Sequence, residues 1–249
     1  MSLRAQRSNP IEKMNQNSHI KIGGVETFSI VDFPSQVAAV IFMQGCPWRC
    51  PFCYNQALQK IGEPGSVIWE KFVEFLKQRK KVLDAVVFSG GEPLVQNGLG
   101  EAMDEVKALG YKIGLHTGGY RPSALEKVLT KVDWIGFDIK APLEEERYKK
   151  VVGSANHLKE VEKSLKIIID SNIDFECRTT CDPRILSIDD ISKIADSLKA
   201  LGVQKYSLQK YRPLDSDKTT QDAECEKFFH DEKLRKYLEE KFASVEFRK

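Results

Sequence analysis

Short apolar segments alternate with amphipathic segments along most of the chain, and this alternation constrains the fold more than any other feature. The apolar segments are rich in β-branched residues and several end in glycine, which predicts buried strands. The segments between them carry apolar residues at helical spacing, which predicts helices. The predicted strands are 37–45, 84–91, 112–119, 132–140, 173–180 and 205–212. The predicted helices are 67–80, 99–110, 121–131, 157–172, 187–202 and 223–242.

About six β/α units therefore follow one another in unbroken alternation of strand and helix. Such a series predicts an α/β fold with a parallel sheet wrapped by helices, in the form of a partial (β/α)6 TIM-like barrel. A doubly wound open sheet is the alternative. No low-complexity linker divides the chain, so we expect a flexible tail over residues 1–18 and a single domain over 19–249. A short strand or hairpin is expected around residues 23–34.

The bulk composition excludes several classes of protein. The chain is 41% hydrophobic and 30% charged, as in ordinary globular proteins, and its net charge of +2 gives no case for nucleic-acid binding. No apolar run approaches the roughly 18 residues of a membrane span, and the polar N-terminus has no secretory signal. We therefore expect a cytoplasmic protein, in which clustered cysteines indicate metal or redox chemistry rather than disulfides.

Three of the six cysteines lie in the segment GCPWRCPFCYN, directly after the first of these predicted strands. Cys46, Cys50 and Cys53 have the spacing CxxxCxxC. A structural zinc site needs four ligands, and a redox pair would not need Cys46. Iron–sulfur clusters are usually held by four thiolates, so three thiolates leave one iron open to a substrate or cofactor. A zinc-binding or redox interaction module without turnover remains an alternative.

The cysteine spacing, with the aromatic Phe52 before the third cysteine, resembles the radical S-adenosylmethionine enzymes. The resemblance implies that Cys46, Cys50 and Cys53 are metal ligands and part of the catalytic centre. They would hold a [4Fe-4S] cluster whose fourth iron binds S-adenosylmethionine, and one electron would split the sulfonium to give a 5′-deoxyadenosyl radical. Phe52 and Tyr54 would lie beside the bound cofactor. The family more often has His at the position of Tyr54.

A second motif, GGEP, follows the second of the predicted strands listed above. Taken alone, Gly90, Gly91 and Glu92 indicate a tight turn into a helix. In context the motif is similar to the GGEP motif of the same family. The glycines would let the backbone approach the methionine moiety of the cofactor, and Glu92 would help to hold its amino group.

The motifs LHTGGY and FDIKAP supply further candidates. Asp138 and Lys140 alternate on a predicted strand and should face the same side, where an ion pair is the alternative to a binding role. TGG, with Thr117, and DIK resemble signatures of glycyl-radical enzyme activases, in which the lysine contacts the carboxylate of S-adenosylmethionine. Relatives that activate pyruvate formate-lyase have Asp in place of His116, so their monovalent cation site is in doubt here.

Two later strands add polar residues at their ends. By the same resemblance, Arg178 would contact the cofactor and Gln209 would border its adenine or ribose. The alternative for both is an ordinary polar rim. The other cysteines, Cys177, Cys181 and Cys225, are predicted to be buried or partly buried thiols. Residues 54–176 contain no cysteine, so no auxiliary clusters are expected.

Over about residues 20–214 these motifs together resemble the activating proteins of anaerobic ribonucleoside-triphosphate reductase, within the pyruvate formate-lyase activating group. The resemblance implies an enzyme that generates a glycyl radical on a partner, above all that reductase. It also implies an electron donor of the flavodoxin or ferredoxin type. The alternative is an enzyme acting on a small molecule, similar to 7-carboxy-7-deazaguanine synthase. A closed polar pocket would favour the alternative, whereas an activase needs an open lateral groove, lined by residues such as His116, Tyr120 and Tyr211.

Overall fold

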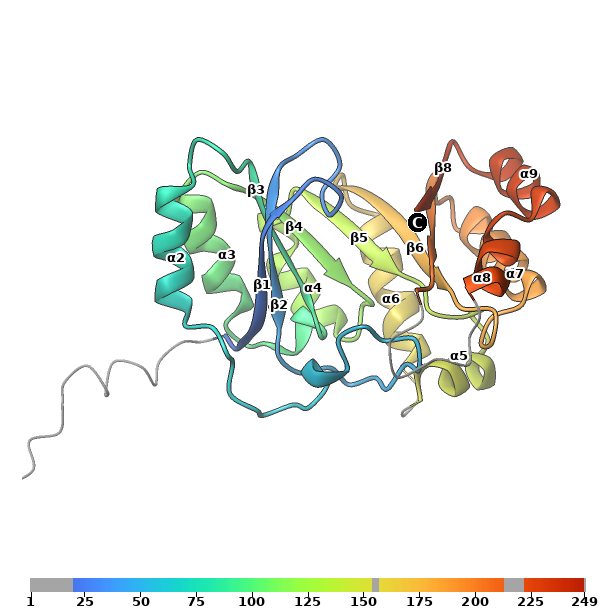
Figure 1. Ribbon diagram of the computed structural model, residues 1–249, viewed down its shortest axis with the longest axis horizontal. Coiled ribbons are helices and arrows are strands. Elements are labelled where there is room, and N and C mark those ends of the chain that lie inside the picture. Colours follow the sequence, from blue (N-terminus) through green and yellow to red (C-terminus); the bar gives the residue numbers. More distant parts are fainter. Residues whose placement is uncertain (1–19, 154–156, 213–221, 249) are drawn as a thin grey trace, which may run out of the picture.

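The computed structural model describes residues 20–153, 157–212 and 222–248, so the predicted tail over residues 1–18 lies outside the described residues. One eight-stranded sheet runs through the molecule in the order β1 to β8 (Figure 1). The strand β1 is antiparallel to β2, and every later neighbouring pair is parallel. The strands are β1 (Ile22–Ser29), β2 (Ala38–Met43), β3 (Ala85–Gly90), β4 (Lys112–Thr117), β5 (Trp134–Asp138), β6 (Asp174–Cys181), β7 (Lys205–Lys210) and β8 (Ser244–Arg248).

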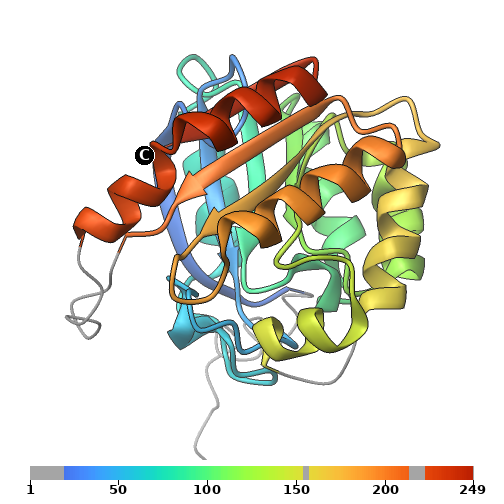
Figure 2. The ribbon, with the colours of Figure 1, turned by 90° about the vertical axis from the view of Figure 1, so that its right-hand side faces the viewer.

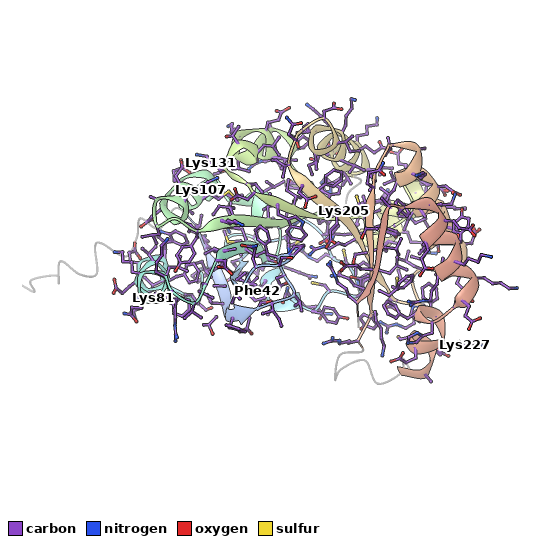
Figure 3. The ribbon with its side chains drawn as sticks, turned by 90° about the horizontal axis from the view of Figure 1, so that it is seen from above. Phe42, Lys81, Lys107, Lys131, Lys205 and Lys227 are labelled. Atoms are coloured by element: carbon purple, nitrogen blue, oxygen red, sulfur yellow. The ribbon has the colours of Figure 1, made fainter. Side chains whose placement is uncertain are left out.

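The helices lie along the convex side of the curved sheet, as the view from above shows (Figure 3). They are α2 (Trp69–Gln78), α3 (Leu99–Ala108), α4 (Pro122–Val128), α5 (Glu145–Val152), α6 (Leu158–Ile169), α7 (Ile188–Ala200), α8 (Asp222–Phe229) and α9 (Glu232–Lys241). Three short 3-10 turns add η1 (Gln56–Leu58), η2 (Pro93–Val95) and η3 (Leu129–Lys131). Among the described residues, no helix is both long and apolar enough to cross a bilayer. Helices on one side of a curved parallel sheet confirm the partial barrel and not the doubly wound alternative.

The sheet differs from the predicted series at its C-terminal end. The closing helix expected over 223–242 is two helices, because the carboxylate of Asp231 accepts a hydrogen bond from the backbone N–H of Leu234 at 2.8 Å and starts α9 there. The second of these helices, α9, packs against α7 outside the sheet (Figure 2). The chain then forms β8, which pairs with β7 and was not predicted.

Side chains on the two faces of the sheet have different environments. On the convex face, Ile41, Met43 and Phe88 belong to the large core shared with the helices. On the concave face, a smaller cluster includes Phe33 and Trp134, whose rings stack with centroids 5.5 Å apart. The remainder of the concave face is polar, and the described strands β1 and β8 are the two edges of the sheet. The fold thus leaves a polar inner surface that is open on one side.

Candidate active site

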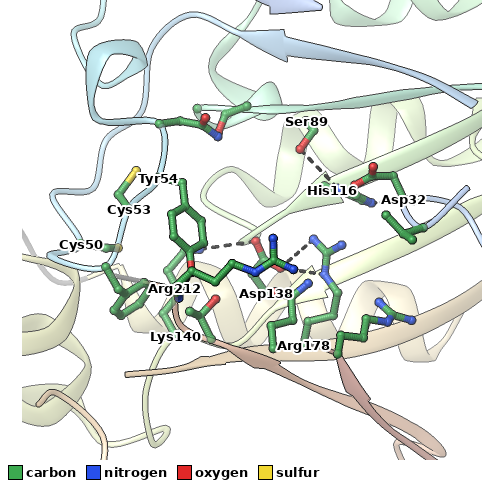
Figure 4. Close-up of a pocket in the computed structure, with 18 of the residues that line it drawn as sticks. Asp32, Cys50, Cys53, Tyr54, Ser89, His116, Asp138, Lys140, Arg178 and Arg212 are labelled. Carbon is green, nitrogen blue, oxygen red and sulfur yellow. Dashed lines mark hydrogen bonds and ion pairs between the residues drawn. The ribbon is translucent and has the colours of Figure 1, made fainter. Parts of the chain in front are cut away.

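A cavity of about 950 Å³ occupies the concave side of the sheet and joins the cysteine loop to the ends of β3 to β8 (Figure 4). Exposed residues such as Ile30 and Arg212 are part of its lining, so the cavity opens to the outside. Most of the predicted site residues lie in this lining, namely Cys46, Cys50, Phe52, Cys53, Tyr54, Gly90, Gly91, Asp138, Lys140, Arg178 and Gln209. Two predicted residues, Glu92 and Thr117, do not line it.

The loop with the three cysteines is fixed by its backbone. The N–H of Gly45 donates to the carbonyl of Leu58 at 2.7 Å, and the N–H of Arg49 donates to the carbonyl of Val152 at 2.7 Å. The Arg49 guanidinium also donates to the carbonyl oxygen of Cys46 at 2.8 Å. These bonds tie the loop to itself and to the end of α5.

The thiols at this end of the cavity fit a cationic metal centre. Burial raises the pKa of Cys46 to about 12 and that of Cys50 to about 11, so the neutral thiols are favoured without a nearby positive charge. A bound metal supplies that charge and deprotonates its thiol ligands. Among the described residues, no three His, Cys, Asp or Glu side chains are placed to bind a single ion. An iron–sulfur cluster bonds its thiolates to separate iron atoms, so it does not need three ligands around one ion.

The two glycines of the GGEP motif are required by neighbouring backbone. A Cβ atom on Gly90 would lie 2.2 Å from the backbone nitrogen of Met43, and one on Gly91 would lie 2.2 Å from the carbonyl oxygen of Gly45. Gly90 also has a φ of +104°, which favours glycine. The prediction explained these glycines by the approach of a ligand, whereas the structure shows that β3 must first pass close to β2 and the cysteine loop.

The carboxylate of Glu92 is buried and fully engaged within the protein. It accepts hydrogen bonds from the hydroxyl of Thr117 at 2.6 Å, from the N–H of Gly118 at 2.9 Å and from the N–H of Leu94 at 3.1 Å. Burial raises the pKa of Glu92, and these three bonds oppose the rise. These bonds make Glu92 a brace between the ends of β3 and β4, and its predicted contact with the amino group of the cofactor stays a prediction.

Asp138, Lys140 and Arg178 form a charged group in the cavity, as Figure 4 shows. The Arg178 guanidinium donates two hydrogen bonds to one oxygen of Asp138, at 2.9 Å and 2.7 Å. The ammonium of Lys140 lies 3.5 Å from the other oxygen. Burial alone would raise the pKa of Asp138, but the charges of Arg178 and Lys140 hold it below its usual range. The prediction that Asp138 and Lys140 face the same side is confirmed. The two residues are paired and both line the cavity, so the pairing does not decide between the structural role and the binding role.

Trp48 is a site residue that the sequence reasoning missed. Its ring is buried in the cavity lining, and its indole N–H is buried with no hydrogen-bond partner among the described residues. A Cβ atom on Gly118 would lie 2.5 Å from this ring, so the TGG motif leaves space for it. The sequence feature that could have identified Trp48 is its position between Cys46 and Cys50, two of the clustered cysteines.

His116 holds a loop instead of facing an ion. One of its ring nitrogens, Nε2, lies 2.8 Å from the carbonyl oxygen of Asp32, and the other lies 3.2 Å from the hydroxyl of Ser89. Burial, assisted by the charge of Arg178, lowers the pKa of His116 to about 3. The neutral ring therefore donates to Asp32 and accepts from Ser89. Both nitrogens are engaged, which leaves neither available to a cation.

The aromatic residues expected at the mouth are placed differently. His116 lines the cavity, but Tyr120 and Tyr211 do not, so that part of the prediction is wrong. Tyr120 packs edge-on against Trp48, with centroids 6.1 Å apart. Tyr211 is buried and stacks on Tyr54 at 5.8 Å. The prediction of buried thiols is confirmed for the remaining cysteines, Cys177, Cys181 and Cys225.

Comparison with known proteins agrees with this geometry. The family model of the radical SAM superfamily matches residues 40–181, which include the three clustered cysteines and the DIK motif. The chain belongs to the radical SAM superfamily. Its cofactors are therefore a [4Fe-4S] cluster and S-adenosylmethionine, which the thiols and charged groups of the cavity fit.

Two curated relatives place the chain within the superfamily. A candidate glycyl-radical enzyme activating enzyme of Methanocaldococcus jannaschii is 30% identical over 207 residues, which cover 78% of this chain and 81% of the relative. The pyruvate formate-lyase-activating enzyme of Clostridium pasteurianum is 28% identical over 235 residues, 88% of this chain and 97% of the relative. The chain thus falls in the group of glycyl-radical enzyme activating enzymes.

A solved structure shares the fold at low sequence identity. Streptococcus suis SuiB bound to its precursor peptide SuiA superposes with a TM-score of 0.65 at 16% identity. The match covers 83% of this chain but only 48% of SuiB, so the chain spans about half the length of that protein.

Proposed function

We propose that this radical SAM activating enzyme generates the glycyl radical of anaerobic ribonucleoside-triphosphate reductase. The observation that carries the proposal is the laterally open cavity, which connects the cysteine loop to a protein surface rather than enclosing a small substrate. Its volume of about 950 Å³ is at the upper end of the roughly 300–1,000 Å³ usual for ligand sites. A site that must hold a cluster, a nucleoside cofactor and a peptide segment needs such space.

One group of cavity residues lies at the cysteine loop and would hold the cluster. The thiols of Cys46, Cys50 and Cys53 hold the cluster, with Phe52 and Tyr54 beside it. Gly90 and Gly91 form the adjacent backbone edge. When bound, the reduced cluster supplies the electron that cleaves S-adenosylmethionine.

The charged group at the ends of β5 and β6 would orient the cofactor. The ammonium of Lys140 would neutralise its carboxylate, and the pair of Asp138 and Arg178 keeps Lys140 charged and in place. Gln209, at the end of β7, borders the nucleoside. The braced ends of β3 and β4, with Glu92 and Thr117, support this arrangement from behind the lining.

The partner and the location of the enzyme follow from this chemistry. Hydrogen transfer from a glycine requires its Cα to come within roughly 3–3.5 Å of the 5′ carbon of the cofactor. A loop of the reductase must therefore leave its own fold and enter the open side of the cavity. The electron comes from a donor of the flavodoxin or ferredoxin type, in the cytoplasm of a cell that works without oxygen.

The test uses anaerobically reconstituted enzyme, S-adenosylmethionine, reduced flavodoxin and the reductase deuterated at glycine Cα. The expected results are a glycyl-radical signal in electron paramagnetic resonance and deuterium in the 5′-deoxyadenosine. The same experiment with pyruvate formate-lyase tests the other partner that the relatives suggest. Label that comes only from pyruvate formate-lyase, or only from a pterin-like small molecule, contradicts the proposal.

A further inference from the structure

Tyr54 links the cysteine loop to the carboxyl end of β7. Its hydroxyl oxygen accepts a hydrogen bond from the backbone N–H of Arg212 at 2.6 Å, across 158 positions of sequence. Figure 4 shows the ring of Tyr54 extending from the cysteine loop towards Arg212. Both residues belong to the lining of the cavity. Since Tyr54 directly follows Cys53, this contact joins the third thiol of the cluster site to the chain just beyond β7.

The ring of Tyr54 makes a second contact at the same place. It lies nearly parallel to the ring of Tyr211, at an interplanar angle of 13° and with centroids 5.8 Å apart. The guanidinium of Arg184 lies 5.0 Å from the centre of the Tyr211 ring, and the buried carboxylate of Asp182 accepts two hydrogen bonds from it, at 3.0 Å and 2.7 Å. The N–H of Tyr211 also donates to the carbonyl oxygen of Cys181 at 3.3 Å. Tyr54 therefore packs against a ring that is itself fixed to the ends of β6 and β7.

The next residue, Asn55, ties the loop to a different strand. Its side-chain amide donates to the carbonyl oxygen of Gly90 at 3.3 Å, at the end of β3. The strands β4, β5 and β6 lie between β3 and β7 in the sheet. Two consecutive residues thus connect the cysteine loop to strands that are not neighbours. Tyr54 supplies the connection that fixes the separation between the cluster site and the end of β7.

We propose that Tyr54 is a positioning residue for the nucleoside end of S-adenosylmethionine. By holding the end of β7, with Gln209, at a constant separation from the cluster site, it sets the span that the bound cofactor must bridge. Without this contact the free protein would populate conformations in which the end of β7 is displaced, and cofactor binding would have to reverse the displacement. The loss of affinity is then limited by the free energy of the contact itself. This inference rests on the proposed placement of the nucleoside beside Gln209 and names the residue that maintains it.

The test compares Tyr54→Phe and Tyr54→Leu with wild type, all as reconstituted enzyme. Equilibrium dialysis gives the dissociation constants of S-adenosylmethionine and of methionine, which lacks the nucleoside. Tyr54→Phe removes one neutral hydrogen bond and should raise the dissociation constant of S-adenosylmethionine about twofold to tenfold. Tyr54→Leu also removes the ring stack and should raise it further, by up to about tenfold. The affinity for methionine should stay at the wild-type value in both variants, because methionine does not reach the end of β7.

Amide hydrogen exchange gives a readout that does not depend on affinity. In enzyme without S-adenosylmethionine, exchange over residues 205–212 should be faster in Tyr54→Phe than in wild type, and saturating cofactor should restore the wild-type rate. Tyr237→Phe is the matched control, because its hydroxyl donates to Asp196 at 2.7 Å from a position on α9 outside the cavity lining. The control should leave both dissociation constants and this exchange unchanged.

Several outcomes overturn the inference. One is an affinity for S-adenosylmethionine that is equal in wild type and in both Tyr54 variants. Others are a loss of methionine affinity by the same factor, or a low iron content in Tyr54→Phe, since either places the effect at the cluster and not at the nucleoside. Tyr54 is 47% exposed, so its replacement leaves the core intact, and melting temperature checks this. If Tyr54→Leu alone loses iron, Tyr54→Phe decides the outcome.

Failure of this inference is distinguishable from failure of the proposed function. The function fails if wild-type enzyme forms no glycyl radical on the reductase, whatever its affinity for the cofactor. The inference fails on the binding and exchange measurements alone, in which no partner enzyme is present.

Discussion

The ammonium of Lys140 lies 5.2 Å from the centre of the Trp48 ring. This contact joins the loop that carries the clustered cysteines to the end of β5, where Asp138 lies 3.5 Å from the same ammonium. The carboxylate and the aromatic face thus hold Lys140 from two sides. If Lys140 binds the cofactor carboxylate as proposed, the position of that carboxylate should depend on Trp48 as well.

Replacement of Trp48 by Leu is expected to weaken binding of S-adenosylmethionine, while replacement by Phe preserves most of it. A cation–π contact contributes about 0.5–2 kcal/mol, which corresponds to a roughly twofold to thirtyfold rise in dissociation constant when it is lost. Equilibrium dialysis with labelled cofactor measures the change in both variants. Iron content serves as the control, because it shows whether the cysteine loop still holds the cluster. Equal affinity in the Leu and Phe variants would show that the aromatic face does not hold Lys140.

The cluster assignment predicts a sharp division among the cysteines. Cys46→Ala, Cys50→Ala and Cys53→Ala should each abolish the broad brown absorption of the reconstituted protein and most of its iron. Cys177→Ser, Cys181→Ser and Cys225→Ser should keep both, because these thiols are buried away from the cavity. Loss of the cluster in a Cys225 variant together with its retention in a Cys46 variant would refute the assignment.

Replacement of Glu92 is predicted to change the free energy of unfolding, whereas replacement of Lys140 is predicted to change the affinity for S-adenosylmethionine. Glu92→Gln replaces a carboxylate that accepts three hydrogen bonds, so it should lower the free energy of unfolding by about 1.5–3 kcal/mol. Lys140→Gln should change stability less, because Asp138 keeps its two bonds from Arg178. It should raise the dissociation constant of S-adenosylmethionine about tenfold to a hundredfold.

Urea unfolding and equilibrium dialysis separate these two effects. Glu70→Gln, at an exposed position on α2, is the control for the loss of one carboxylate. A Glu92 variant with normal stability but weak cofactor binding would restore the direct contact that was first predicted.

The sequence was sufficient to predict most of the strands and helices, since apolar runs and helical periodicity depend on local residues, but helix α5 (Glu145–Val152) was not among them. It was also sufficient to predict that Cys46, Asp138 and Lys140 lie close together, because the carboxyl ends of parallel strands share one edge of the sheet. It failed for β8, whose five residues carry only two apolar side chains, Val245 and Phe247. A strand that short is stabilised by its pairing with β7 and not by its own pattern.

Side-chain directions beyond the strand ends could not be predicted in the same way. Strand alternation ends where the backbone leaves the strand, and Lys140 already lies two residues beyond the end of β5 at Asp138. At Gly90 the φ of +104° turns the chain, and Glu92 then points behind the lining towards Thr117. Tyr211 follows β7 directly and turns inward onto Tyr54. These directions depend on contacts between segments far apart in the sequence.

The buried ring of His116 predicts a specific pH dependence of stability. Its pKa is about 3 in the folded protein, against about 6.5 for an unperturbed histidine. Between these values the unfolded state binds more protons than the folded state, so stability falls as the pH is lowered from about 6.5 towards 3. In His116→Gln this contribution is absent. The stability advantage of wild type over the variant should therefore shrink by up to roughly 1.4 kcal/mol for each pH unit below about 6.

Urea unfolding of the cluster-free protein at pH 7, 6 and 5 measures this difference, because cluster loss at low pH then plays no part. Other groups titrate equally in both proteins and cancel in the comparison. Since His116 holds the loop through Asp32, the variant should also expose that loop to proteolysis at pH 7, which tests its positioning role directly. Stability curves that stay parallel from pH 7 to pH 5 would mean that the imidazole is not held neutral by burial.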